Sequence, residues 1–133
     1  MHTKRHQSFT LEVWKKARAL KNELFQLIQA FPSEERYRLS DQIVRCSRSV
    51  TANIAEGHGR FTSKDQIHFC IQARGSLSEV LNHLIDAYDC RYISEEKLLD
   101  LKSKIAEVER ILNGYIGYLR GNLVKGSSDH LIS

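Results

Sequence analysis

The chain has 133 residues, of which 41% are hydrophobic and 27% are charged, and its formal net charge is +4. This size and balance fit one globular domain with a usable core and exclude a disordered chain. No apolar run approaches the ~20 residues that span a bilayer, and the N-terminal residues lack an apolar signal segment, so we expect a cytoplasmic protein without a membrane partner.

The first half of the chain predicts two amphipathic helices. The first spans about residues 10–30, where Val13, Trp14 and other apolar residues recur at helical spacing. Pro32 ends this helix, and Ser33 is the predicted cap of a second helix over about residues 34–57. The predicted inward residues of the second helix are Leu39, Ile43, Cys46, Val50, Asn53 and Ile54.

The second half predicts two more helices. Ser63 and Gln66 form a capping-box pattern at the start of the third helix, and the fourth starts near Ser94. The predicted inward residues of the third are Ile67, Cys70, Ile71, Leu77, Leu81, Leu84, Ile85 and Tyr88. The fourth carries a heptad seam of Leu98, Leu101, Ile105, Val108, Leu112, Tyr115 and Leu119.

Short connections between four such helices predict an all-α fold, an antiparallel up-down-up-down four-helix bundle. We expect the bundle to cover residues 10–120, between a flexible basic leader at 1–9 and a mobile tail at 121–133.

Catalytic and metal-binding patterns are missing from the sequence. It contains no Glu-x-x-His pair, the hallmark of di-iron bundles, and no phosphate-binding glycine loop. Cys46, Cys70 and Cys90 are expected to be buried thiols, and His58 a solvated residue at a helix end. We therefore expect no enzyme activity, no cofactor and no metal.

The basic residues concentrate in the first half of the chain. Residues 1–60 hold eleven Lys and Arg against six Asp and Glu, whereas residues 61–133 hold nine against ten. A basic cluster on the first helix is the better candidate for a nucleic-acid surface, and its members are Lys15, Lys16, Arg18 and Lys21. Trp14 shares the apolar stripe and is interpreted as a core residue rather than a stacking platform.

Arginines on the second helix allow two interpretations. Arg38, Arg45 and Arg48 lie close together at spacings of 7 and 3 and could bind phosphates. The spacings Glu34–Arg38, Asp41–Arg45 and Glu56–Arg60 instead favour ion pairs within the helix. Arg48 has no such partner within its helix, so it joins the candidates for nucleic-acid binding.

Two sequence blocks carry a family resemblance. Residues 31–43 contain Phe31-Pro32, Leu39 and Gln42-Ile43, and residues 49–60 read SVTANIAEGHGR. Together with the segment ARGSLSE at residues 73–79, they resemble the family of the protein encoded in intervening sequences of bacterial 23S ribosomal RNA genes. The resemblance implies an antiparallel four-helix bundle that assembles into a homopentamer.

The block at residues 49–60 is interpreted as architectural. Its motif residues are Asn53, Glu56, Gly57 and Arg60. Asn53 lies on the inward stripe and could fix the register of neighbouring helices, as buried Asn residues do in coiled coils. The alternative is a ligand site. Gly114, Gly117 and Gly121 weaken the fourth helix and predict a close helix or subunit approach there.

Our functional hypothesis is a non-enzymatic, oligomeric helical-bundle adaptor that binds RNA, DNA or a nucleic-acid enzyme through its basic surface. The fold that the resemblance implies also occurs in accessory proteins of diversity-generating retroelements, which form pentamers and work with a reverse transcriptase. The alternative hypothesis is a structural protein–protein interaction module without a nucleic-acid role.

Overall fold

The computed structural model describes residues 4–132, with side chains except those of His6 and of residues from 125 onward. It contains four long helices: α1 (Lys4–Ile28), α2 (Leu39–His58), α3 (Ser63–Asp89) and α4 (Glu95–Ile132). A short 3-10 helix, η1 (Ser33–Glu35), lies between α1 and α2. No strand occurs in this part of the chain, and the predicted all-α class is confirmed.

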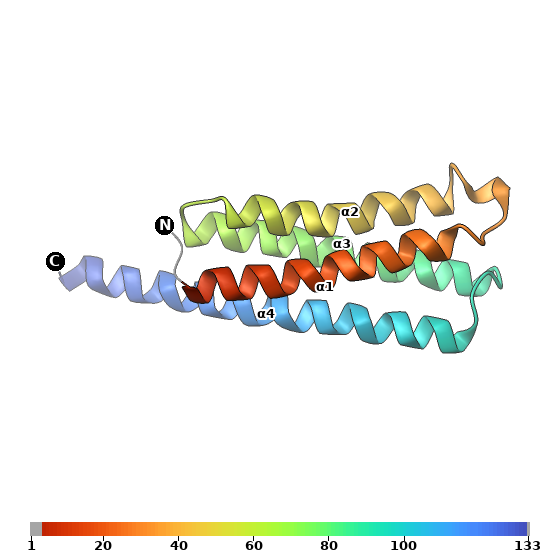
Figure 1. Cartoon of the computed structure of the whole chain (residues 1–133). Helices are drawn as coiled ribbons and strands as arrows, with labels where there is room; N and C mark the ends of the chain where they lie inside the picture. Colours follow the sequence, from red (N-terminus) through yellow and green to blue (C-terminus); the bar gives the residue numbers. More distant parts are fainter. Residues whose placement is uncertain (1–3, 133) are drawn as a thin grey trace.

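The four helices form an antiparallel up-down-up-down bundle (Figure 1). Contacts connect α1 with α2, α2 with α3, α3 with α4, and α4 with α1, so the helices close into a ring around one core. The start of α1 and the α2–α3 turn lie at one end, and α4 extends beyond the other helices there (Figure 1).

The helical ends differ from two predicted boundaries. α1 begins at Lys4, within the segment expected as a leader, and α4 continues through residues 121–132, which were expected to be a tail. Residues 1–3 and 133 lie outside the described residues. The mobility of both segments stays a prediction.

The core confirms most of the predicted stripes. Every member of the α4 seam from Leu101 to Leu119 is buried, and Leu98 packs against the core at its end. Val13, Ala17, Leu20 and Leu24 of α1 pack with Ile43, Val50 and Ile54 of α2 in the same cluster. The seven-residue spacing of the seam keeps one face of α4 toward its neighbours over its length.

The start of the second helix was predicted wrongly. Ser33 does not cap it: Ser33 begins η1, and α2 starts only at Leu39. The backbone of Arg38 has φ −121° and ψ −107°, outside the helical region, so one continuous helix cannot run through it. Phe31 is buried and its ring lies 5.3 Å from that of Tyr92, which anchors this connection to the α3–α4 turn.

The start of the third helix shifts by one residue. Thr62, not Ser63, is the cap, and its hydroxyl accepts a 3.1 Å hydrogen bond from the backbone N–H of Asp65. Because Thr62 is the cap, Asp65 rather than Gln66 stands three residues after it, and the Gln66 side chain donates to the Arg60 carbonyl oxygen at 2.8 Å. The predicted start of the fourth helix is confirmed, since Ser94 Oγ accepts from the N–H of Lys97 at 3.0 Å.

Part of the predicted α3 stripe was wrong. Ile71, Ile85 and Tyr88 are exposed, while smaller residues face the core instead, namely Ala73, Ser76, Val80 and Ala87. Short side chains let α3 approach its neighbouring helices closely. The face of α3 that carries the short side chains therefore forms the interface, and the larger residues lie at the edge of that interface.

Two of the three cysteines are buried as predicted, and Cys90 is exposed instead, just after α3. Burial raises the pKa of the Cys46 thiol to about 11, with a further rise from the charge of Glu79, and burial raises that of Cys70 to about 12. Neither thiol is therefore appreciably ionised at neutral pH, which removes the reactive form.

Candidate nucleic-acid interface

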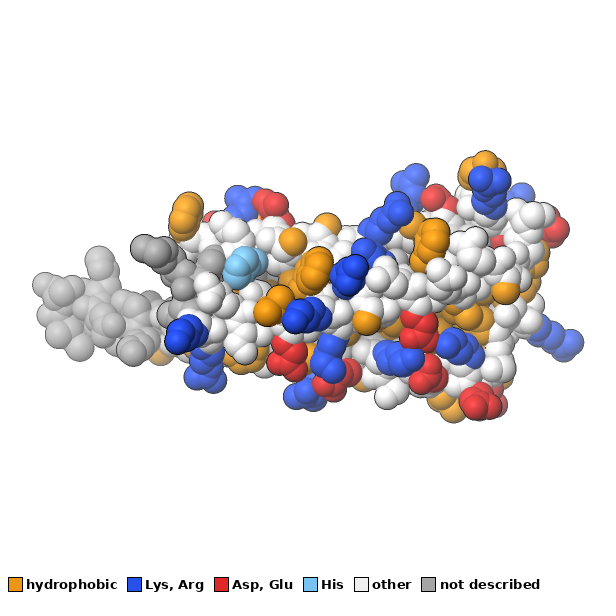
Figure 2. All heavy atoms as spheres, in the orientation of Figure 1, with side chains coloured by type: hydrophobic (Ala, Val, Ile, Leu, Met, Phe, Trp, Pro, Cys, Tyr) orange, Lys and Arg blue, Asp and Glu red, His pale blue; other side chains and the backbone are white. Residues whose placement is uncertain are grey.

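Two candidate cations from different helices meet in one hollow. Lys21 of α1 and Arg48 of α2 both line a surface depression of about 210 Å³ between the two helices. Among the residues that the structure describes, neither cation lies within ion-pair distance of a carboxylate. Figure 2 shows Lys and Arg side chains gathered over the middle of α1 and α2, with hydrophobic side chains among them.

The other cations of α1 do not all share this face. Lys15 and Arg18 are exposed, and the Arg18 guanidinium lies 5.9 Å from the centre of the Trp14 ring. Lys16 is directed toward α4, where its Nζ lies 3.9 Å from Glu107 Oε1. Lys16 therefore faces α4 and does not line the hollow.

The arginines predicted on helix 2 are separated by the fold. Arg45 donates to Asp41 Oδ2 at 2.9 Å, which confirms the predicted pair. Glu34 lies in η1 and Arg38 precedes α2. The predicted i,i+4 pair between them therefore does not form on one helix. Arg48 is left as the exposed arginine of α2 that faces α1.

The motif around Gly57 holds the α2–α3 turn together. A Cβ atom built on Gly57 would lie 2.9 Å from the Cβ of Phe69, a distance that real Cβ atoms avoid, so only glycine allows this approach of α2 to α3. Arg60 donates to Glu56 Oε1 at 2.6 Å, and its guanidinium lies 4.8 Å from the Phe69 ring centre. These contacts support the architectural interpretation of the motif.

Asn53 is half-buried and bonds differently from the prediction. Its amide donates to the Ser49 carbonyl oxygen at 2.8 Å and to Ser49 Oγ at 3.1 Å, both within α2. The link between helices is made by Ser76 of α3, whose hydroxyl donates to Ser49 Oγ at 2.9 Å. Among the hydrogen bonds of the described residues, Asn53 is linked to α3 through Ser49.

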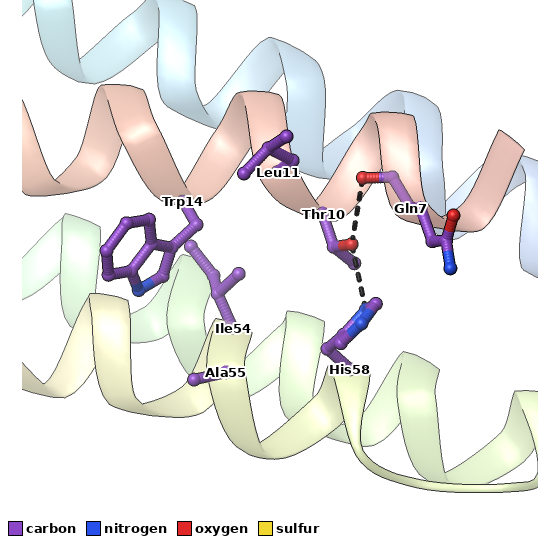
Figure 3. A pocket seen from close by; sticks show the side chains of 7 residues that line it. All are labelled: Gln7, Thr10, Leu11, Trp14, Ile54, Ala55 and His58. Atoms are coloured by element: carbon purple, nitrogen blue, oxygen red, sulfur yellow. Dashed lines mark hydrogen bonds between the residues drawn. The ribbon is translucent and has the colours of Figure 1, made fainter. Parts of the chain in front are cut away.

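A second, larger depression lies nearer the start of α1. It measures about 460 Å³, and Leu11, Trp14 and Ala55 give it an apolar lining (Figure 3). Leu11 is 53% exposed. At one end Thr10 Oγ1 and His58 Nδ1 are 2.8 Å apart (Figure 3), so His58 is not the solvated residue that was predicted. Trp14 is half-buried and packs against the core, as predicted.

Sequence reasoning missed Phe25, which also lines the Lys21–Arg48 hollow and is 48% exposed. The available signal was its spacing. Phe25 follows Lys21 by four residues, so both side chains share one face of α1. Its neighbour Leu24 is buried in the core. Two adjacent apolar residues do not show from the sequence which of them is exposed.

Neither metal sites nor membrane spans stand out within the described residues. No group of three or more His, Cys, Asp and Glu side chains is arranged to hold a metal ion. No described helix combines the length and apolarity needed to cross a bilayer.

Comparison with protein families matches residues 10–114 to the 23S rRNA-intervening sequence protein family. The chain belongs to this family. The match includes the whole motif from Asn53 to Arg60 and all residues that line the Lys21–Arg48 hollow. No curated protein matches the chain.

A solved structure has the same fold. It is a Bacteroides thetaiotaomicron protein of unknown function from the S23 ribosomal protein family, with a TM-score of 0.75 and 22% sequence identity. The alignment covers 82% of this chain and 98% of that one. The likeness confirms the bundle, and at this identity it supports the fold alone.

Proposed function

We propose that this member of the 23S rRNA-intervening sequence protein family is a non-enzymatic, oligomeric adaptor that binds nucleic acid through the α1–α2 face. The observation that carries the proposal is the hollow shared by Lys21 and Arg48, two cations without a described carboxylate partner. Phosphate groups would supply the missing counter-charge, and Arg binds them in a bidentate way. Lys15 and Arg18 extend the positive surface along α1.

Charge reversal on this face tests the proposal. We expect Lys15→Glu with Arg18→Glu to weaken binding of RNA and DNA about tenfold or more, and to lower the salt slope by about two, because phosphate contacts release counterions. Arg48→Ala should cause the next largest loss of binding. Arg45→Ala should cause the smallest loss, because Arg45 is already paired with Asp41. The measurement is fluorescence anisotropy across a salt series.

Lys102→Glu is the control for Lys15→Glu alone, because both change the net charge by the same amount and Lys102 is exposed on α4, which does not contact α2. An equal loss from Lys102→Glu would indicate that only net charge matters. A wild-type chain that binds no nucleic acid at low salt would overturn the proposal.

The apolar depression beside Leu11 and Trp14 favours a second candidate, a protein–protein interaction module. Exposed apolar residues in a groove between two helices are typical of protein contact sites. A nucleic-acid enzyme such as a reverse transcriptase is the partner class to test first. Such an enzyme would contact the apolar groove while its nucleic acid contacts the basic face. Loss of partner binding on Leu11→Lys, with nucleic-acid binding intact, would support this role.

A further inference from the structure

The hollow between α1 and α2 combines three kinds of chemistry. Lys21 and Arg48 supply positive charge, Phe25 supplies an accessible aromatic ring, and Asn22 and Ser47 supply hydrogen-bonding groups. Such a combination exceeds what binding to a phosphate backbone requires. Cations are sufficient to bind phosphates. An exposed aromatic ring beside them adds to the affinity only if the ligand places a flat apolar group on the ring.

The ring is accessible where its neighbours are not. Phe25 is 48% exposed, whereas Leu24 and Ile43, which also line the hollow, are fully buried beneath it. Val44 lies half-buried on the α2 side. The floor is therefore apolar apart from the buried Ser47 hydroxyl, and the cations and the Asn22 amide stand around it.

The size of the hollow limits what it can accept. Its volume is about 210 Å³. A single planar group enters such a space, and a double helix does not. In a duplex both faces of each base are already stacked on neighbouring pairs, so Phe25 could gain a stacking contact only from an unpaired base.

The polar groups suit the edge of a base. Ser47 donates its hydroxyl proton to the Val44 carbonyl oxygen at 3.1 Å, which leaves the hydroxyl oxygen as an acceptor. The Asn22 amide can both donate and accept. Neither group selects one base, so the expected recognition is tolerant of sequence.

We propose that this hollow binds one unpaired nucleotide of a single strand, with its base stacked on Phe25 and its flanking phosphates at Lys21 and Arg48. This inference rests on the proposed nucleic-acid binding and assigns single-stranded nucleic acid as its preferred substrate class.

The test compares a labelled single-stranded RNA with a duplex of the same sequence, using fluorescence anisotropy. Phe25→Leu keeps an apolar side chain but removes the ring. Since stacking of one base on an aromatic ring contributes about five- to 160-fold in affinity, we expect single-strand binding to fall at least fivefold and duplex binding to change less than about twofold. Phe25→Trp should restore single-strand binding.

Phe61→Leu is the matched control. Phe61 is 89% exposed on the α2–α3 turn, at the opposite end of the bundle from the α1–α2 connection. Thermal unfolding followed by circular dichroism shows that each variant is folded. Equal losses on single strand and duplex, or an equal loss from Phe61→Leu, would overturn the inference while leaving the basic face in place. A wild-type chain that binds neither probe would overturn the proposed function itself.

Discussion

At the scale of single residues, Gly57 shows how one missing side chain permits a helix contact. The α2 and α3 backbones approach until the Phe69 Cβ occupies the space that a Gly57 Cβ would need. Gly75 offers the opposite case. It lies within α3, and no described atom outside its own helix lies within 4 Å of the position of an added Cβ.

Alanine at these two positions should therefore have opposite effects. Gly57→Ala forces α2 and α3 apart at the turn, and we expect it to lower the free energy of unfolding by about 1–3 kcal/mol. Gly75→Ala should raise it by up to about 1 kcal/mol, because alanine is the better helix former. Urea unfolding followed by circular dichroism measures both, and a loss of stability in Gly75→Ala would contradict the helical environment described for it.

Asn53 and Ser49 define a second prediction at this scale. Asn53→Ala removes hydrogen bonds within α2 only, so we expect a cost of about 0.5–1.5 kcal/mol. Ser49→Ala removes the acceptor for Ser76 as well and should cost more. The order of the two unfolding midpoints in urea decides whether the link to α3 passes through Ser49. A larger cost for Asn53→Ala would instead indicate a direct role of its amide between helices.

At the scale of helices, Glu23 joins α1 to α4. Its carboxylate accepts from Lys97 and from Lys104, each at 2.7 Å. Partial burial alone would raise the pKa of Glu23, but the hydrogen bonds from Lys104 and Lys97 outweigh it and lower the pKa below the ordinary 4.5. Because the pKa of Glu23 is lower in the folded state than in the unfolded chain, its ionised carboxylate stabilises the fold at pH values above the unfolded pKa.

We therefore expect Glu23→Gln to destabilise the bundle at pH 7 by about 0.5–1 kcal/mol, the range of partly exposed ion pairs. The difference from wild type should shrink as the pH falls below 4.5, through the lowered pKa of the folded state. Thermal unfolding at several pH values measures this. Glu79→Gln on α3, where no described cation forms an ion pair with Glu79, should show no comparable difference at pH 7.

At the scale of the whole molecule, the bundle leaves several apolar side chains uncovered. Ile71 and Ile85 of α3 are exposed and lie on its outer side, together with Tyr88 near the end of the helix. An added Cβ at Gly117 or Gly121 of α4 would meet no described atom within 4 Å, and one at Gly114 would lie 3.9 Å from Phe9. The close approach predicted for these glycines is therefore not made by Gly117 and Gly121 within one chain.

A homo-oligomer would cover such surfaces, and the family resemblance names a pentamer. We expect light scattering to give a mass several times the 15.4 kDa of one chain. Ile71→Lys with Ile85→Lys should reduce that mass if the outer side of α3 is a subunit contact, whereas Phe61→Lys on the α2–α3 turn should not. A mass of 15.4 kDa for the wild type at micromolar concentration would contradict the prediction.

The helices and much of the core are predictable from the sequence, because both depend on local periodicity. The α4 seam repeats every seven residues, and the α1 stripe follows helical spacing, so each face is specified by its own segment. The ion pairs Asp41–Arg45 and Glu56–Arg60 were predictable for the same reason, since partners four residues apart on one helix meet regardless of the fold.

Which surfaces meet depends on how the helices pack in three dimensions. Lys21 and Arg48 were both candidates from the sequence, but their shared hollow with Phe25 depends on how α1 and α2 align. The connection between α1 and α2 is likewise anchored by a distant residue, because the Phe31 ring contacts that of Tyr92, sixty-one residues away in the chain. The exposure of Ile71 and Ile85 depends on α3 packing through its smaller residues. Such features are set by contacts between distant segments, and a local pattern carries no information on which distant segment will cover it.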